Sequence, residues 1–289
     1  MTSQEIAVSF LCDRNRLYGI LHRPCQPSDE GIVILAGRPA LRSGRHRSFV
    51  LLARSWAEAG IPVMRFDYRG SGDSEGEMGT LDQTPRDISA AVDAFQSNMP
   101  GLQKVVLWGQ CGGAADAILY APKDARVSGI VLANPWIYDS RVRSLTALYR
   151  RWSLYLWRVR DIFSASTHST LGNNPLEQPY TGSGPEFSVP FETPEVDRAY
   201  RSYRASDISK RLANSLREFN GRVLVILSGR DAGAQAFKQT ASLSLHWRQI
   251  LSSKRVRTEE LPAANHSLRR PEWRDAAAAR TLQWLRNPS

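Results

Sequence analysis

The segment Gly109-Gln110-Cys111-Gly112-Gly113 constrains the fold of this chain more than any other feature, and it directly follows the apolar run 105–108. An apolar run that ends in Gly-x-Cys-x-Gly is typical of a buried strand that turns sharply into a helix through a nucleophile elbow. Cysteine replaces the usual serine. The turn needs small flanking residues because the nucleophile has a strained backbone and its neighbours pass close to other elements. The sequence therefore predicts a strand, a tight elbow at Cys111 and a helix from Gly112.

Two interpretations of Cys111 follow from this position. The helix dipole and the free N–H groups at a helix N-terminus favour a reactive thiolate, whereas a buried cysteine between glycines would only fill space. The other two cysteines are Cys12 and Cys25. Three cysteines provide neither a disulfide framework nor metal-ligand spacing, so we expect a reducing, cytoplasmic location.

Apolar runs and helical periodicities alternate along most of the chain. Residues 4–11 and 16–23 are expected to form an antiparallel hairpin. Further strands are expected at 31–36, 62–67, 105–108, 127–133, 223–227 and 255–260, and helices at 49–59, from 84, at 112–120, 235–247 and 271–285. Repeated strand–helix units with buried strands predict an α/β fold, a mostly parallel sheet with helices on both faces.

Residues 136–220 interrupt this alternation. An aromatic stripe with helical spacing is followed by a stretch rich in glycine, proline, asparagine and serine. We expect an inserted helical cap or lid here, with residues 1–135 and 221–289 forming the core domain. An arginine-flanked aromatic helix resting on a membrane surface is the alternative. The residues expected to bind substrate are Arg38, Trp136, Tyr138, Tyr149 and Trp152.

A thiol nucleophile needs a base and a third group that orients the base. In the chain order nucleophile, acid, histidine, the acid follows a later strand and the histidine precedes the last helix. Asp231 and His266 occupy those places. Asp231 could instead serve only as a helix N-cap. In that case Asp139 would be the substitute acid.

Acyl transfer also needs donors for the oxyanion that develops at the attacked carbonyl. The backbone N–H of Gly112 is the first candidate. The second is the N–H of Arg38, in the turn after strand 31–36, because Pro39 has no N–H.

Composition narrows the classes of partner. The chain has 289 residues, 42% hydrophobic, and a net charge of +10. Its arginines are dispersed, so we expect no nucleic-acid binding, although the loop arginines Arg38, Arg42, Arg45 and Arg47 could hold an acidic substrate or partner. No secretory signal and no apolar run of transmembrane length are expected.

The segment Phe66-Asp67-Tyr68-Arg69-Gly70-Ser71-Gly72-Asp73-Ser74, the cysteine elbow, and the order Cys111, Asp231, His266 resemble the α/β-hydrolase superfamily. Residues 37–39, 43–47 and 66–76 more narrowly resemble the exosortase A system-associated hydrolase 1 family. The resemblance implies an α/β-hydrolase fold and a cytoplasmic, hydrolase-like protein. It supplies no specific reaction.

The residues predict an acyl hydrolase of the esterase or thioesterase kind that forms a covalent acyl-cysteine. The substrate would be a small acyl compound, which a carrier could deliver. Neither a metal nor an organic cofactor is required. An acyltransferase that passes the acyl group to an alcohol or amine would use the same residues, and a non-catalytic binding protein on a hydrolase scaffold is a further alternative.

Overall fold

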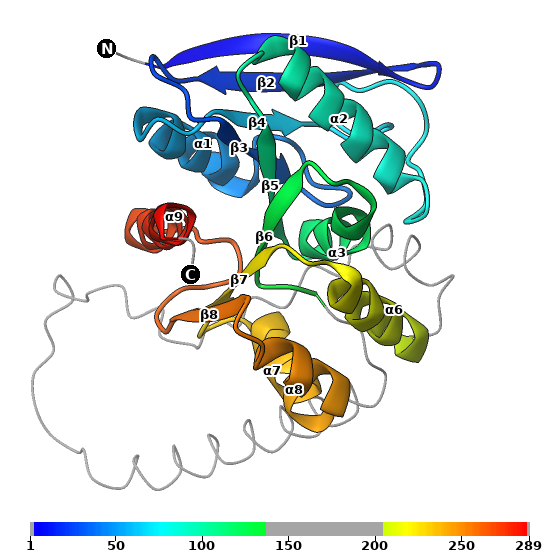
Figure 1. Cartoon of the computed structure of the whole chain (residues 1–289), viewed down its shortest axis with the longest axis vertical. Coiled ribbons are helices and arrows are strands. Elements are labelled where there is room, and N and C mark those ends of the chain that lie inside the picture. Colours follow the sequence, from blue (N-terminus) through cyan, green and yellow to red (C-terminus); the bar gives the residue numbers. More distant parts are fainter. Residues whose placement is uncertain (1–2, 137–204, 288–289) are drawn as a thin grey trace, which may run out of the picture.

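An eight-stranded sheet organises the chain in the computed structural model, which describes residues 3–136 and 205–287 (Figure 1). The strands run in the order β1-β2-β4-β3-β5-β6-β7-β8. Only the β1–β2 and β2–β4 pairs are antiparallel, and every other pair is parallel. This is the α/β-hydrolase fold expected from the sequence.

The strands lie close to their predicted positions. They are β1 (Gln4–Cys12), β2 (Asn15–Arg23), β3 (Glu30–Leu35), β4 (Val63–Phe66), β5 (Lys104–Gln110), β6 (Val127–Ala133), β7 (Arg222–Ser228) and β8 (Val256–Leu261). The expected hairpin turns through Asp13, whose φ of 55° lies in the left-handed region that aspartate tolerates better than most residues. The N-terminal hairpin is therefore confirmed.

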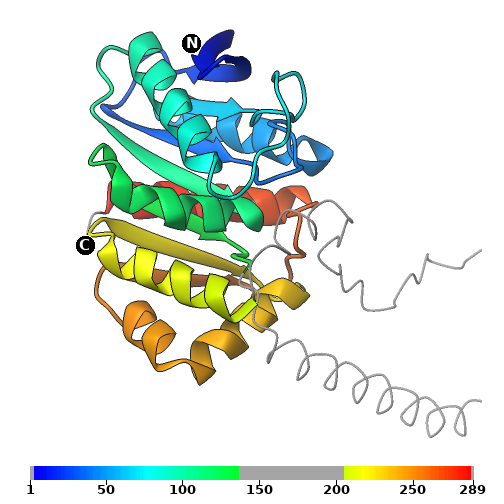
Figure 2. The same ribbon diagram turned by 90° about the vertical axis from the view of Figure 1, so that its right-hand side faces the viewer.

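Helices cover both faces of the sheet, as the two perpendicular views of Figure 1 and Figure 2 show. α1 (Ser48–Glu58) and α9 (Pro271–Arg286) lie on one face, and α2 (Thr84–Asn98), α3 (Gly112–Tyr120) and α6 (Ala205–Glu218) lie on the other. Two short 3-10 helices, Arg45–Arg47 and Ala121–Lys123, complete the connections in this part of the chain.

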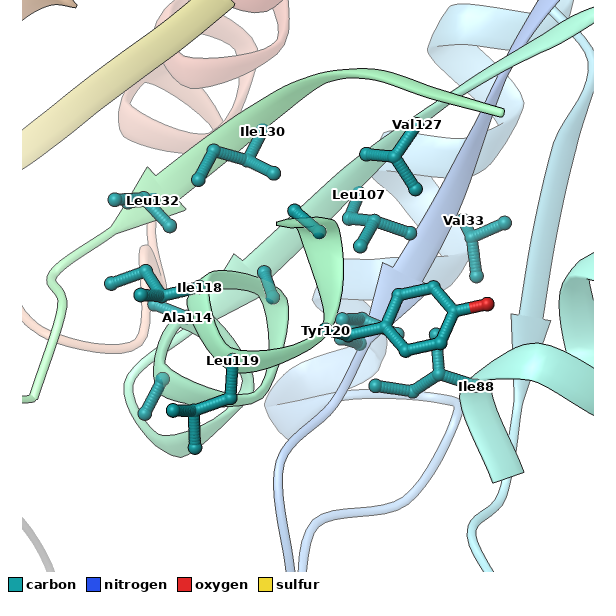
Figure 3. Close-up of a cluster of buried hydrophobic side chains, with 14 of the residues drawn as sticks. Val33, Ile88, Leu107, Ala114, Ile118, Leu119, Tyr120, Val127, Ile130 and Leu132 are labelled. Carbon is teal, nitrogen blue, oxygen red and sulfur yellow. The ribbon is translucent and has the colours of Figure 1, made fainter. Parts of the chain in front are cut away.

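Alternation along the strands divides the core between these two layers. Val33 of β3 and Leu107 of β5 point into the cluster under α2, α3 and α6, part of which is drawn in Figure 3. Ile34 and Trp108, one residue further along the same strands, join the cluster under α1 and α9. Because side chains alternate across a strand, both faces of a central parallel strand are buried, and residues 32–35 and 105–108 are accordingly apolar.

The helix expected at 235–247 is wrong as a single element. Ser244 leaves the helical region with ψ 121° and separates α7 (Ala232–Leu243) from α8 (Leu245–Leu251). Its hydroxyl accepts a hydrogen bond from the Trp247 N–H and caps α8. A serine side chain that bonds to nearby backbone groups can end one helix and begin the next. Helix propensity alone does not predict where this happens.

The expected cap, residues 136–220, falls largely outside the described residues. Its last part is α6, which packs Ile208, Leu212 and Leu216 into the core beside α3. The division into a core domain and a cap stays a prediction. Within the described ranges, no helix has both the length and the apolar composition needed to cross a membrane.

Candidate active site

Cys111 lies at the junction of β5 and α3 with φ 54° and ψ −115°, an unusual conformation for a residue with a side chain. The neighbouring glycines permit this turn. A Cβ at Gly113 would overlap the Leu35 carbonyl, and a Cβ at Gly109 would overlap the Gly113 carbonyl. The sequence predicted close approach here, and the structure identifies the end of β3 as the element that comes close to the helix.

The loops after β7 and β8 bring Asp231 and His266 together. Nδ1 of His266 lies 2.9 Å from Oδ2 of Asp231, whose side chain is fully buried. Asp231 also caps α7, accepting hydrogen bonds from the N–H groups of Gly233 at 3.0 Å and Ala234 at 3.2 Å. The Asp231 carboxylate therefore caps α7 and contacts His266 at the same time.

His266 also interacts with Cys111. Burial lowers the pKa of the imidazole, but hydrogen bonds to Asp231 and Cys111, together with their charges, raise this pKa to about 10. The Cys111 side chain is only half-buried. An imidazole thus lies between a buried carboxylate and a half-buried cysteine, the arrangement required for a thiol nucleophile and its base.

The predicted oxyanion donors lie on adjoining backbone segments. A Cβ at Gly37, φ 70°, would overlap the N atom of Gly113, so the turn after β3 packs directly on the start of α3. Among the described residues, the N–H groups of Arg38 and Gly112 donate to no protein acceptor. Two free N–H groups this close to a nucleophile fit a site for developing negative charge.

The side chain of Arg38 turns away from the surface. Only 5% of Arg38 is exposed, and its Nη1 donates to the Gly79 carbonyl. Its other neighbours include Tyr68 and Asp116, both buried. Burial raises the pKa of Asp116 to about 6, while Arg38 and Tyr68 oppose this change. The proposed substrate-binding role of this side chain stays a prediction.

A second arginine of the same loop is also engaged within the protein. The buried Asp67 carboxylate accepts a hydrogen bond from the Arg42 N–H at 2.6 Å and pairs with its guanidinium. Arg42 pairs with Asp73 as well. These bonds hold the loop after β3 against the loop after β4. Of the arginine cluster expected from the sequence, Arg38 is buried, whereas Arg45 and Arg47 are exposed.

Trp136 is the one predicted aromatic pocket residue that lies within the described part of the chain. Its N–H donates to the carbonyl of Cys111 at 3.4 Å, and its side chain is partly buried against the core. The other three, Tyr138, Tyr149 and Trp152, lie outside the described residues, as does the substitute acid Asp139.

Two polar residues near His266 were not identified from the sequence. The side-chain amides of Gln110 and Asn134 both donate to the backbone carbonyl of His266, the latter at 3.1 Å. Gln110 lies inside the elbow motif, and Asn134 follows β6 at the sheet edge that carries the triad. A polar residue at the carboxyl end of a central strand is the signal that could have identified either of them.

Comparison with known families assigns the chain to a family of hydrolases. Residues 28–267 match the family described as serine aminopeptidase, S33. The chain belongs to this family. The serine aminopeptidase family is named for a serine nucleophile, whereas the elbow of this chain carries Cys111. Fold and family together make the chain an α/β hydrolase.

Solved structures support the fold. An esterase of Pyrococcus furiosus superposes with a TM-score of 0.64 at 15% identity, covering 98% of this chain and 91% of its own. Est1E from Butyrivibrio proteoclasticus, solved with ferulic acid, gives 0.61 at 16%, covering 97% and 100%. Dienelactone hydrolase from Anabaena variabilis gives 0.60 at 15%, covering 99% and 98%.

Curated relatives match over a short stretch. An uncharacterized 31.7 kDa protein in the traX-finO intergenic region of Escherichia coli is 38% identical over 82 residues, which is 27% of this chain. The chain spans only 29% of that relative's length.

Proposed function

We propose that this protein is an acyl hydrolase of the esterase or thioesterase kind, with Cys111 as nucleophile, His266 as base and Asp231 as the group that orients the base. The observation that carries the proposal is the position of His266, whose Nδ1 contacts the buried Asp231 carboxylate while its ring also interacts with Cys111. Structural residues seldom combine a half-buried cysteine, an imidazole and a buried carboxylate in this order.

The reaction would proceed in two halves. His266 takes the proton of the Cys111 thiol. The sulfur attacks the acyl carbon, and the electron pair of the carbonyl moves onto its oxygen, which the N–H groups of Arg38 and Gly112 stabilise. The bond to the leaving group then breaks, and His266 protonates that group. Water, deprotonated by His266, attacks the acyl-cysteine, and the carbon–sulfur bond breaks to release the acid and regenerate the thiol.

A cysteine nucleophile favours substrates with good leaving groups. The imidazole beside the sulfur can accept the proton of the thiol, and thiolates attack activated acyl groups readily. Thioesters, enol esters and lactones are therefore better substrates than plain amides. The esterases and the dienelactone hydrolase among the structural neighbours are consistent with ester-type substrates.

Several finer assignments belong to the same proposal. We propose that Arg38 and Trp136, with Tyr138, Tyr149 and Trp152, contribute to substrate binding, that the acyl substrate is small or carried by another molecule, and that the protein acts in the cytoplasm without a cofactor. Membership of the exosortase A system-associated hydrolase 1 family rests on the sequence resemblance alone.

Trapping the acyl-cysteine tests the proposal. The protein is mixed with a p-nitrophenyl ester and with an acyl thioester, quenched in acid, and the peptide containing Cys111 is weighed. An adduct of acyl mass on that peptide, which disappears as free acid accumulates, is expected. Product formed only when an alcohol or amine is added would instead identify an acyltransferase. Absence of both adduct and product with every acyl donor would contradict the proposal and favour the alternative of a non-catalytic binding protein.

A further inference from the structure

The main chain of His266 has an unusual set of partners. His266 lies in the loop between β8 and α9, and its backbone carbonyl accepts hydrogen bonds from two side-chain amides. The donors are Gln110, 156 positions away in the chain, and Asn134, 132 positions away. Both donors are buried, with 8% and 2% of their surface exposed, so water competes little for these bonds.

Each donor links His266 to a different part of the triad. Gln110 directly precedes Cys111 at the end of β5, so its hydrogen bond to the His266 carbonyl joins the histidine loop to the strand that leads into Cys111. Asn134 follows β6 and also exchanges hydrogen bonds with Ser228, accepting from its N–H at 2.7 Å and donating to its Oγ at 2.9 Å. Ser228 ends β7, three residues before Asp231.

We propose that Gln110 and Asn134 are positioning residues that set the distance between the His266 imidazole and the Cys111 sulfur by fixing the His266 carbonyl. The inference rests on the proposed function, since it concerns the same triad. The imidazole can occupy only the space that its main chain allows, and a displacement of about 1 Å costs about a hundredfold in rate. The backbone of Asn134, with φ 46°, is held in the left-handed region where its amide reaches both partners.

Gln110→Met is the first test, because methionine keeps the length of the side chain and removes the donor. Its matched control is Gln96→Met, since the Gln96 amide also donates to a backbone carbonyl, that of Leu102, at 3.3 Å and outside the site. Asn134→Gly is the second test. Glycine tolerates the left-handed backbone, so this variant removes the amide without adding backbone strain, and it answers the same question if Gln110→Met does not fold.

Two readouts separate positioning from a general structural role. The first is turnover of a p-nitrophenyl ester, for which kcat should fall about tenfold in Gln110→Met while KM changes by less than about twofold. The second is alkylation by iodoacetamide from pH 5 to 9, followed on the Cys111 peptide by mass spectrometry because Cys25 is also exposed. We expect the rate at pH 6, relative to that at pH 9, to fall several-fold as the imidazolium moves away from the sulfur.

The outcomes are distinct. Wild-type kcat and an unchanged alkylation profile in both Gln110→Met and Asn134→Gly would overturn the inference, as would an equal loss in Gln96→Met. If the wild-type protein turned over no acyl substrate, the proposed function would fail. The alkylation profiles would still decide whether the two amides position His266 against Cys111.

Discussion

One oxygen of Asp231 serves two purposes: Oδ2 contacts Nδ1 of His266 at 2.9 Å and accepts the N–H of Ala234 at 3.2 Å, in the first turn of α7. The carboxylate thus needs the helix for its own orientation, and the helix needs the carboxylate as its cap. The hydrogen bonds to the first turn of α7 therefore set the position of the carboxylate relative to that helix. The orientation of the imidazole therefore depends on the start of α7.

Asp231→Asn and Asp231→Ala should separate these two roles. Asparagine is also a good N-cap, so Asp231→Asn should keep the melting temperature within a few degrees while kcat falls by about a hundredfold or more, because the negative charge that stabilises the imidazolium is lost. Asp231→Ala should lose kcat and also about 1 kcal/mol of stability from the missing cap. Kinetics and thermal denaturation check both variants. Equal activity of Asp231→Asn and the wild type would make the residue a cap only.

Replacement of Cys111 should be decisive for the proposed function. Cys111→Ala should reduce turnover of a p-nitrophenyl ester by more than about a thousandfold, since no covalent intermediate can form. Cys111→Ser should retain only a small fraction of the activity, because a hydroxyl needs more help from the base than a thiol does. Cys25→Ser, at an exposed position, is the control and should keep full activity. Wild-type turnover by Cys111→Ala would remove this residue from the mechanism.

The pH dependence of stability should report on His266. The pKa of this residue is raised to about 10 by Asp231 and Cys111, in opposition to burial, while an unfolded histidine titrates near 6.5. A raised pKa stabilises the folded state fully below about pH 6.5, and that contribution is lost as the pH rises through about 10. Urea denaturation of the wild type and His266→Gln should therefore show a stability difference that shrinks above neutral pH. A difference that stays constant from pH 6 to 10 would contradict the assignment.

Gly113 should tolerate no side chain. A Cβ there would overlap the carbonyl of Leu35, which belongs to β3 and cannot move without disturbing the centre of the sheet. Gly113→Ala should lose at least about 2 kcal/mol of stability, as overpacking of rigid backbone does. Gly101→Ala is the matched control because a Cβ there meets nothing within 4 Å, and it should change stability by less than about 0.5 kcal/mol. Circular dichroism during urea denaturation measures both variants, and equal stability of the two would show that the elbow can relax.

The sequence was sufficient to predict most of the fold and to select the residues of the candidate site. The centres of the buried strands are continuous apolar runs, and the helix from Gly112 to Tyr120 begins inside the glycine-rich elbow motif. Asp231 and His266 could be selected because their place after particular strands puts them at one edge of a parallel sheet. The undivided helix at 235–247 was the wrong prediction, since the Ser244 cap depends on a local hydrogen bond and not on periodicity.

The order of strands and helices, the elbow and the residue types at the strand ends can all be read from the chain, because they are local patterns of hydrophobicity and backbone freedom. Three contacts depend on the assembled fold: Arg38 points inward to Gly79, Asp67 binds Arg42, and two amides bind the His266 carbonyl. These contacts join residues distant in the chain, and their geometry depends on strand register and loop path. No pattern of neighbouring residues encodes such geometry, so it becomes visible only when the sheet is assembled.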